Sequence, residues 1–398
     1  VRGAVGTGGF TYEGDYNVNT PTPGFTTQRV WGSALSVEHQ FDWATFTNLV
    51  GTRYIRTTST LDADYVPTQL TYVDVESRAR TFQEEARLSS NTTNPLSWQA
   101  GVFYYHSSAQ LLSQTVTGLG VGGLGRGFAI TATMKTDSIA GFGEATYAIT
   151  PTTHLTGGIR YTHEKRGYNG FEVPVNQLAG SPFVAAFTVS RVVTDVSFNK
   201  ATFRVALRQD LSDTANVYAS FNRGFKSGLY ATSAVPGTNP PLRPQTIDAF
   251  EVGIKTQVFD NTLRFNLAGF HYKIKDYQIR TAAVAGGATA FLLNAGIVKV
   301  DGGEIDMEWA PTNELRFTAN ATYLNSRFGA GARSQAYYPR PAVCTPAGPA
   351  LGMTTGPATG GNLLCFGSVT GNQTPQSPKF AASLGLTYTI DIGNEGEL

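Results

Sequence analysis

Two groups of cationic and aromatic residues in this sequence have the chemistry to bind an anion. Arg223 and Lys226 lie close together near the end of one alternating segment, and Tyr337, Tyr338 and Arg340 form a second group in the longest connection. Guanidinium and ammonium groups pair well with carboxylates and phosphates. Both groups are therefore candidate ligand contacts. The alternatives are that the two cations reach lipid phosphates or lumen acids, and that the second group only packs loops.

Two cysteines offer redox chemistry in the same long connection. Cys344 and Cys365 are 21 positions apart, so a bridge between them would close a modest ring. The chain-entropy picture gives such a ring about 3 kcal/mol, and an oxidising compartment outside the cytoplasm permits it. We expect a disulfide, with two unrelated thiols as the alternative. Zinc is not expected, because no histidine or third cysteine lies nearby.

The other polar clusters do not suggest catalysis. Glu304, Asp306 and Glu308 share one face of a segment, where they could hold a cation or be neutralised by Arg or Lys on the neighbouring strand. The GxGxxG pattern at 118–123 lacks the strand and helix that a phosphate loop requires. The histidines are scattered, and the net charge of +1 gives no argument for nucleic acid. We expect no catalytic residue, no cofactor and no resident metal, and hence no enzyme.

The elements that carry these residues alternate with a period of two, which indicates β-strands. In residues 247–258, Phe250 and Ile254 share one face and Glu251 and Lys255 share the other. The longer segments of this kind have the roughly 9–11 residues that a tilted strand needs to cross a bilayer. The charged face is too polar for a dry core, so we place it in a wet lumen and the apolar face in lipid. Aromatic residues near strand ends suit interfacial girdles: Trp43, Tyr54, Trp98, Tyr147, Tyr161, Trp309 and Tyr323.

Short and long connections alternate along the chain, as they do in outer-membrane barrels. The short ones lie at 41–42, 91–96, 150–153, 210–214, 260–261 and 311–313. The long ones lie at about 58–78, 108–135, 166–196, 226–245, 280–298 and 328–376. The sequence therefore predicts an all-β, antiparallel transmembrane β-barrel with short turns on the periplasmic rim and long loops outside.

The predicted wall is incomplete. About thirteen strands follow Trp31, with a stub before Tyr12, and both chain ends look cut, so residues 1–398 are interpreted as one barrel region of a longer exported protein. Barrels in lipid must close, so the parent protein should supply the missing strands. One segment breaks the pattern, because Leu267 and Phe270 fall on opposite faces. A bulge or apolar packing on an internal plug explains this equally well.

Several segments resemble TonB-dependent outer-membrane receptors. They are QEEARLSS at 83–90, which is similar to a strand opening of that family, VYASFNRGFKSGLY at 217–230, the long run at 242–279, NAG at 294–296 and the run at 300–328. Their order and spacing also resemble the family, and the resemblance covers residues 31–392. Gln245 stands where the family usually has Glu, a change that we expect to be harmless.

The resemblance implies a barrel of about 22 strands around an N-terminal plug, of which this chain would supply about 13–14. It also implies a Gram-negative outer membrane, contacts with outer-membrane lipid and lipopolysaccharide, and energy from the TonB complex through the plug, which this chain lacks. The expected ligand is a small molecule such as an iron chelate, in particular a ferric siderophore, and the expected state is a monomer. The alternative is a passive porin-like channel. An outer-membrane enzyme and a soluble adhesin fit less well, and the nutrient itself cannot be read from the sequence.

Overall fold

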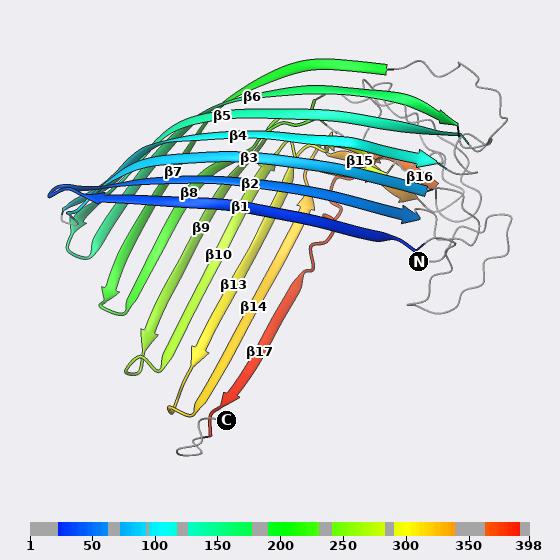
Figure 1. Cartoon of the computed structure of the whole chain (residues 1–398). Coiled ribbons are helices and arrows are strands. Elements are labelled where there is room, and N and C mark those ends of the chain that lie inside the picture. Colours follow the sequence, from blue (N-terminus) through cyan, green and yellow to red (C-terminus); the bar gives the residue numbers. More distant parts are fainter. Residues whose placement is uncertain are drawn as a thin grey trace.

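Thirteen antiparallel strands form one continuous sheet that curves as part of a barrel wall (Figure 1). The computed structural model describes residues 23–62, 72–92, 95–117, 126–176, 190–230, 241–282, 290–338 and 363–390. The wall strands are β1 (Phe25–Gln40), β2 (Ala44–Asp62), β3 (Tyr72–Ser90), β4 (Leu96–Thr117), β5 (Arg126–Thr150), β6 (Thr153–Asn176), β7 (Ser190–Ser212), β8 (Ala215–Lys226), β9 (Gln245–Val258), β10 (Leu263–Lys275), β13 (Val298–Trp309), β14 (Leu315–Phe328) and β17 (Phe380–Tyr388). The all-β class and the number of wall strands are confirmed, and the predicted stub before Tyr12 lies outside the described residues.

The six short connections are confirmed, but the first three long ones are shorter than predicted, whereas the connection at 226–245 has the predicted bounds. Strand β2 continues to Asp62 and β3 begins at Tyr72, so pairing reaches well into the connection predicted at 58–78. Above a bilayer both faces of a ribbon are wet, so period-two alternation fades while the backbone groups still need partners. QEEARLSS also closes β3, rather than opening a strand. Two further hairpins lie inside predicted loops: β11 (Gln278–Ala282) with β12 (Ala290–Asn294), and β15 (Arg333–Tyr338) with β16 (Leu363–Ser368).

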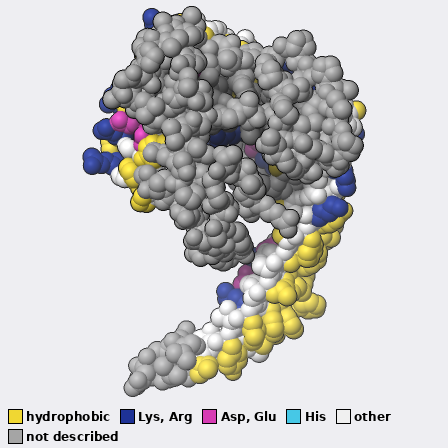
Figure 2. All heavy atoms as spheres, turned by 90° about the vertical axis from the view of Figure 1, so that its right-hand side faces the viewer, with side chains coloured by type: hydrophobic (Ala, Val, Ile, Leu, Met, Phe, Trp, Pro, Cys, Tyr) yellow, Lys and Arg dark blue, Asp and Glu magenta, His cyan; other side chains and the backbone are white. Residues whose placement is uncertain are grey.

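The two faces of the wall differ as the alternation predicts. Phe250 and Val252 are 48% and 45% exposed on the outer face, whereas Glu251 on the inner face accepts a hydrogen bond from Tyr218. Figure 2 shows apolar side chains along the convex side of the uncovered part of the wall and polar and charged side chains on its concave side. Among the described residues, no helix is long and apolar enough to cross a membrane. The apolar side chains make the convex face the surface suited to hydrocarbon.

The irregular strand is β10, and the bulge interpretation is wrong. Its pairing with β9 and β13 runs without a register shift. Phe270, Tyr272 and Ile274 face inward and pack on a buried apolar cluster. That cluster consists of Leu293, Ala295, Val298, Val300, Phe328, Ala332 and Val369. Leu293 lies in β12, and Ala332 and Val369 border β15 and β16, so the chain's own hairpins cover these apolar residues.

A network of side-chain hydrogen bonds connects the β11–β12 hairpin to the wall. The Asn294 side-chain amide donates to the carbonyl oxygens of Arg243 and Asp276, at 3.1 and 2.8 Å. Its Oδ1 accepts from the Arg243 N–H at 2.9 Å, and the Arg243 guanidinium pairs with Asp276 at 2.6 Å. The Gln245 Oε1 accepts the Gln278 N–H at 2.9 Å. Since a Glu carboxylate would accept the same bond, this geometry agrees with the expectation that Gln at position 245 is harmless.

The substitution Ala219→Arg should destabilise the protein in a bilayer by about 2–4 kcal/mol, because a cation on the lipid face near mid-membrane loses its hydration. Ala219 lies opposite Val252 in the middle of β8. The matched control is Ser220→Arg, one residue along and opposite Glu251 on the inner face, which should cost less than about 1 kcal/mol. Urea unfolding in liposomes measures both variants of the intact protein. Equal losses would contradict the assignment of the faces.

Asn294→Asp should weaken the hydrogen-bond network that connects the β11–β12 hairpin to the wall. The substitution removes the two amide donors and points a carboxylate at two carbonyl oxygens, which costs about 1–3 kcal/mol. Amide hydrogen exchange in β11 and β12 should then accelerate by about 5- to 150-fold. Asn325→Asp is the control, because Asn325 accepts a bond from Arg327, at 2.8 Å, and a carboxylate keeps it. Unchanged protection of the hairpin in Asn294→Asp would show that these bonds do not hold it.

Candidate functional site

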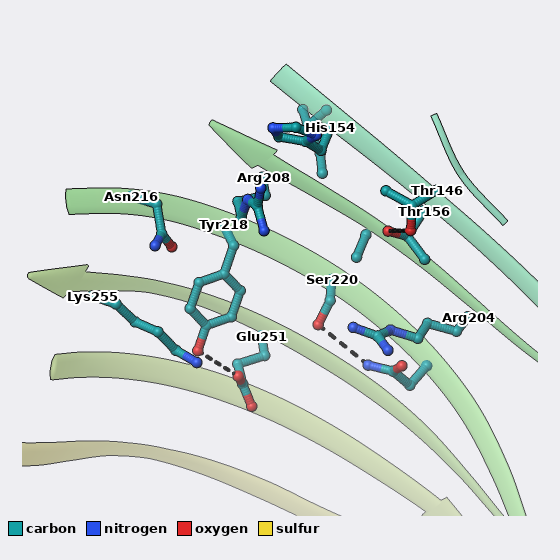
Figure 3. Close-up of a pocket in the computed structure, with 13 residues that line it drawn as sticks. Thr146, His154, Thr156, Arg204, Arg208, Asn216, Tyr218, Ser220, Glu251 and Lys255 are labelled. Atoms are coloured by element: carbon teal, nitrogen blue, oxygen red, sulfur yellow. Dashed lines mark hydrogen bonds between the residues drawn. The ribbon is translucent and has the colours of Figure 1, made fainter. Parts of the chain in front are cut away.

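The inner wall contains a polar recess across five neighbouring strands, β5 to β9. Its volume is about 430 Å³. Its lining includes Thr146, His154, Thr156, Arg204, Arg208, Asn216, Tyr218, Ser220, Asn222, Glu251 and Lys255. Figure 3 shows these side chains projecting from the strands into a common space. Along β8 every second residue from Asn216 to Asn222 contributes to it, as pleating requires.

Tyr218 organises the β8–β9 side of the recess. Its hydroxyl donates to the Glu251 carboxylate at 2.7 Å, and the Lys255 ammonium lies 5.6 Å from its ring centroid. The ring lies across β9 at Gly253, where an added Cβ would come within 2.7 Å of it. Glycine is thus required for this close approach. The result is an aromatic ring held between an acid and a cation.

The β6–β7 side of the recess carries neutralised charges. Arg208 and His154 both contact the Asp210 carboxylate, at 3.0 and 3.1 Å, and Arg204 lies 3.6 Å from Glu144. His154 and Asp210 border short connections, so this end of the recess lies towards the rim with the short turns. The recess therefore offers hydrogen-bonding groups of both signs with little net charge, a lining suited to water and polar solutes.

A second group lies higher on the inner wall, towards the long connections. The rings of Tyr168 and Tyr230 stack with centroids 5.1 Å apart, and the Tyr230 hydroxyl lies 3.2 Å from the Thr194 hydroxyl. Nearby on β6, Arg166 pairs with Glu164 at 2.6 Å, both largely buried. Sequence reasoning missed this group, although the alternation of β6 places Glu164, Arg166 and Tyr168 on one face and signals it.

The two predicted cationic contacts fall on opposite faces. Arg223 lies directly opposite the outer-facing Phe203 and stacks over its ring at 5.2 Å, and it pairs with Asp248 at 2.6 Å. This placement counts against ligand contact by Arg223. Lys226, three residues further, has the opposite parity and is exposed on the inner side at the end of β8, opposite Gln245. Only Lys226 retains the geometry that the prediction requires.

The other predicted site residues are only partly described. Tyr337 and Tyr338 lie on β15, opposite Leu364 and Leu363 of β16, and Arg340 lies outside the described residues. Cys365 lies on β16 opposite Ala336, and Cys344 lies outside the described residues. The aromatic patch and the disulfide therefore remain predictions.

The inner-facing acids of β13 have cationic neighbours. The sequence left two roles open for these acids, cation binding and neutralisation by Arg or Lys on the neighbouring strand, and this arrangement is the second. Arg264 on β10 lies 3.1 Å from Glu308 and 3.6 Å from Asp306. Arg316 on β14 approaches Glu308 at 3.4 Å. Within the described ranges, no cluster of three or more His, Cys, Asp or Glu side chains has the arrangement of a metal site. Glu308 is thus neutralised from both neighbouring strands, and Asp306 from β10.

Comparison with known proteins agrees with this architecture. A curated probable TonB-dependent siderophore receptor PiuA of Acinetobacter baumannii is 24% identical over 248 residues, 61% of this chain and 28% of that protein. The rhizobactin receptor of Rhizobium meliloti is 28% identical over 159 residues, 36% of this chain and 21% of that protein. The crystal structure of the ferric yersiniabactin uptake receptor FyuA of Yersinia pestis superposes with a TM-score of 0.72 at 15% identity, covering 94% of this chain and 49% of that one.

The chain spans about half the length of the FyuA structure that it matches. Residues 2–396 match the family described as TonB dependent receptor-like, beta-barrel. This match agrees with the curved antiparallel sheet, the alternation of its faces and the sorting of its connections. The chain therefore belongs to the TonB-dependent receptor family, as part of its β-barrel.

Proposed function

We propose that the protein containing this chain is an outer-membrane receptor of a Gram-negative bacterium that takes up a ferric siderophore with energy from the TonB complex. The observation that carries the proposal is membership of the receptor family, together with the likeness to the probable siderophore receptor of A. baumannii. The passive-channel alternative has no specific observation in its favour. Family membership also favours a receptor or transporter over an enzyme.

The inner wall supports this proposal chemically. Its recess combines the Tyr218–Glu251 bond, the Lys255 cation and the neutralised Arg208–Asp210 pair. A wall of this kind lets a hydrated, charged complex pass without trapping it, because little uncompensated charge remains. On this proposal, the edges at β1 and β17 pair with further strands, since open edges in lipid leave backbone groups without partners. The plug that contacts TonB would also come from outside the described strands, and the receptor would be monomeric.

The first test is genetic. Deleting the gene should reduce growth under iron limitation on at least one ferric siderophore of a panel, and deleting tonB should reproduce the defect, because both remove the same energised step. Uptake of radioactive iron carried by that siderophore measures the effect, and a plasmid copy is the control. Normal growth on every siderophore would contradict the proposed substrate class. Uptake that survives loss of TonB but not loss of the gene would instead indicate a passive channel.

The second test concerns Lys226. Lys226→Glu should weaken binding of an anionic ferric complex by about 10-fold, because a charge-assisted contact is replaced by repulsion. Arg223→Gln is the matched control, since its cation lies on the outer face beside Asp248 and should leave affinity unchanged. Equilibrium binding of the labelled ferric siderophore to intact cells measures both. Equal affinities of Lys226→Glu and wild type would remove Lys226 as a contact.

A further inference from the structure

Three cations lie close together on the inner wall, at the junction of β6, β7 and β8. Arg160 lies on β6, Lys200 on β7 and Lys226 at the end of β8. Arg160 is directly opposite Thr202, and Lys200 is directly opposite Thr162. Arg160 and Lys200 are therefore diagonal neighbours on one face of the sheet, about 7–8 Å apart. We call Arg160, Lys200 and Lys226 the inner cation cluster.

Lys226 belongs to this cluster because the chain after β8 stays beside β7. The pairing of β7 with β8 ends three residues before Lys200 and Lys226, and the same register continued would place these two residues opposite each other. At Gly228 an added Cβ would overlap the Phe198 ring, so the two segments remain in contact beyond their last pair. The chain thus brings Lys226 towards Lys200, although like charges that face one another destabilise a sheet.

The inner cation cluster lies between the long connections and the recess. Lys200 has the same parity as Arg204 on β7, and Lys226 has the same parity as Asn222 on β8. Both Arg204 and Asn222 line the recess. Since β7 ends at a short connection after Ser212, Lys200 lies beyond Arg204 in the direction of the long connections, by roughly 14 Å along the strand. A solute that enters from the long connections therefore meets the cluster before the recess.

The closest acids along β5 and β6 already have arginine partners. Glu164 pairs with Arg166 at 2.6 Å, and Glu144 lies 3.6 Å from Arg204. Within the described ranges, no member of the inner cation cluster has a carboxylate within ion-pair distance. The cluster therefore has an excess of positive charge, in contrast to the balanced charges of the recess.

Arg160 is oriented by two aromatic rings and a hydroxyl group. Its guanidinium lies 4.9 and 5.8 Å from the ring centroids of Phe103 and Phe142. Its Nε donates to the Thr162 Oγ1 at 3.3 Å, and Thr162 is itself buried. Stacking on aromatic faces and this hydrogen bond restrict the guanidinium plane. In the part of the chain that the structure describes, its two terminal nitrogens have no acceptor, so they are available to a ligand.

We propose that the inner cation cluster binds the negatively charged oxygens of a polyanionic ferric chelate. This inference rests on the proposed function and names its substrate class. Three hydroxamate groups neutralise the charge of a ferric ion, whereas three catecholate groups leave the complex negatively charged. The Arg160 fork and the two lysine ammonium groups form charge-assisted hydrogen bonds with such oxygens. A neutral chelate would leave the repulsion between the cations uncompensated, so the cluster selects for anionic complexes.

The test measures equilibrium binding to the intact, purified protein in neutral detergent. The probes are a synthetic ferric tris-catecholate and a ferric tris-hydroxamate. The wild type should bind the tris-catecholate at least about 10-fold more tightly, and the double variant R160Q, K200Q should lose about 10- to 100-fold of that affinity, because two charge-assisted contacts are removed. The matched control R264Q, R316Q removes two inner-face cations that approach Glu308 instead, and it should keep the affinity.

Four outcomes would overturn the inference. They are binding of neither probe, equal affinity of the wild type for both probes, unchanged affinity of R160Q, K200Q, and a clear loss of its thermal stability without ligand. We expect this variant to be as stable as the wild type or more so, because repulsion is relieved. A loss would show that acids of the same protein neutralise the cluster. Uptake of ferric hydroxamates alone in the genetic test would support the proposed function and overturn only this inference, so the two failures are distinguishable.

Discussion

One constraint governs the rest of this structure: a wall one strand thick separates hydrocarbon from water. Within lipid the backbone cannot bond to solvent, so each strand must pair on both sides. Pleating then sends neighbouring side chains to opposite faces. Phe250 and Glu251 are adjacent in the chain but meet different surroundings for this reason. The outer apolar surface and the inner polar recess therefore follow from one pairing pattern.

The same constraint is released above the bilayer, and this explains the structure of the long connections. Both sides of a ribbon are wet there, so a hairpin needs an apolar surface of its own to hold a fixed position. β12 brings Leu293 against the inner wall at Val298 and Phe328. The Asn294 amide then bonds the neighbouring backbone. The β11–β12 hairpin thus combines apolar packing with a hydrogen-bonded amide side chain.

Much of the fold could be predicted from the sequence because period-two alternation and short turns are local signals. The alternation around Phe250 fixed the faces of β9, and the turns fixed the strand order. The ribbons beyond the membrane, such as β2 to Asp62, carry no such contrast between faces and were missed. The hairpin cover of Phe270 depends on residues distant in sequence. The position of Arg223, by contrast, could have been predicted from local sequence. It has the same parity as Val217, Ala219 and Phe221, which predicts an outer position. The prediction grouped it with Lys226 because the two are close in sequence, although they have opposite parity.

The two faces also handle charge differently, and the contrast bears on what surrounds the wall. The inner acids Asp306 and Glu308 have cross-strand arginine partners, although water in the lumen would screen them even without such pairing. On the outer face, by contrast, Arg29, Arg56 and Arg78 lie directly opposite one another on β1, β2 and β3, and Arg56 pairs with Glu76 at 2.5 Å. Like charges placed directly opposite destabilise a sheet. The pairing pattern that separates apolar from polar side chains therefore does not by itself balance charge on the outer face.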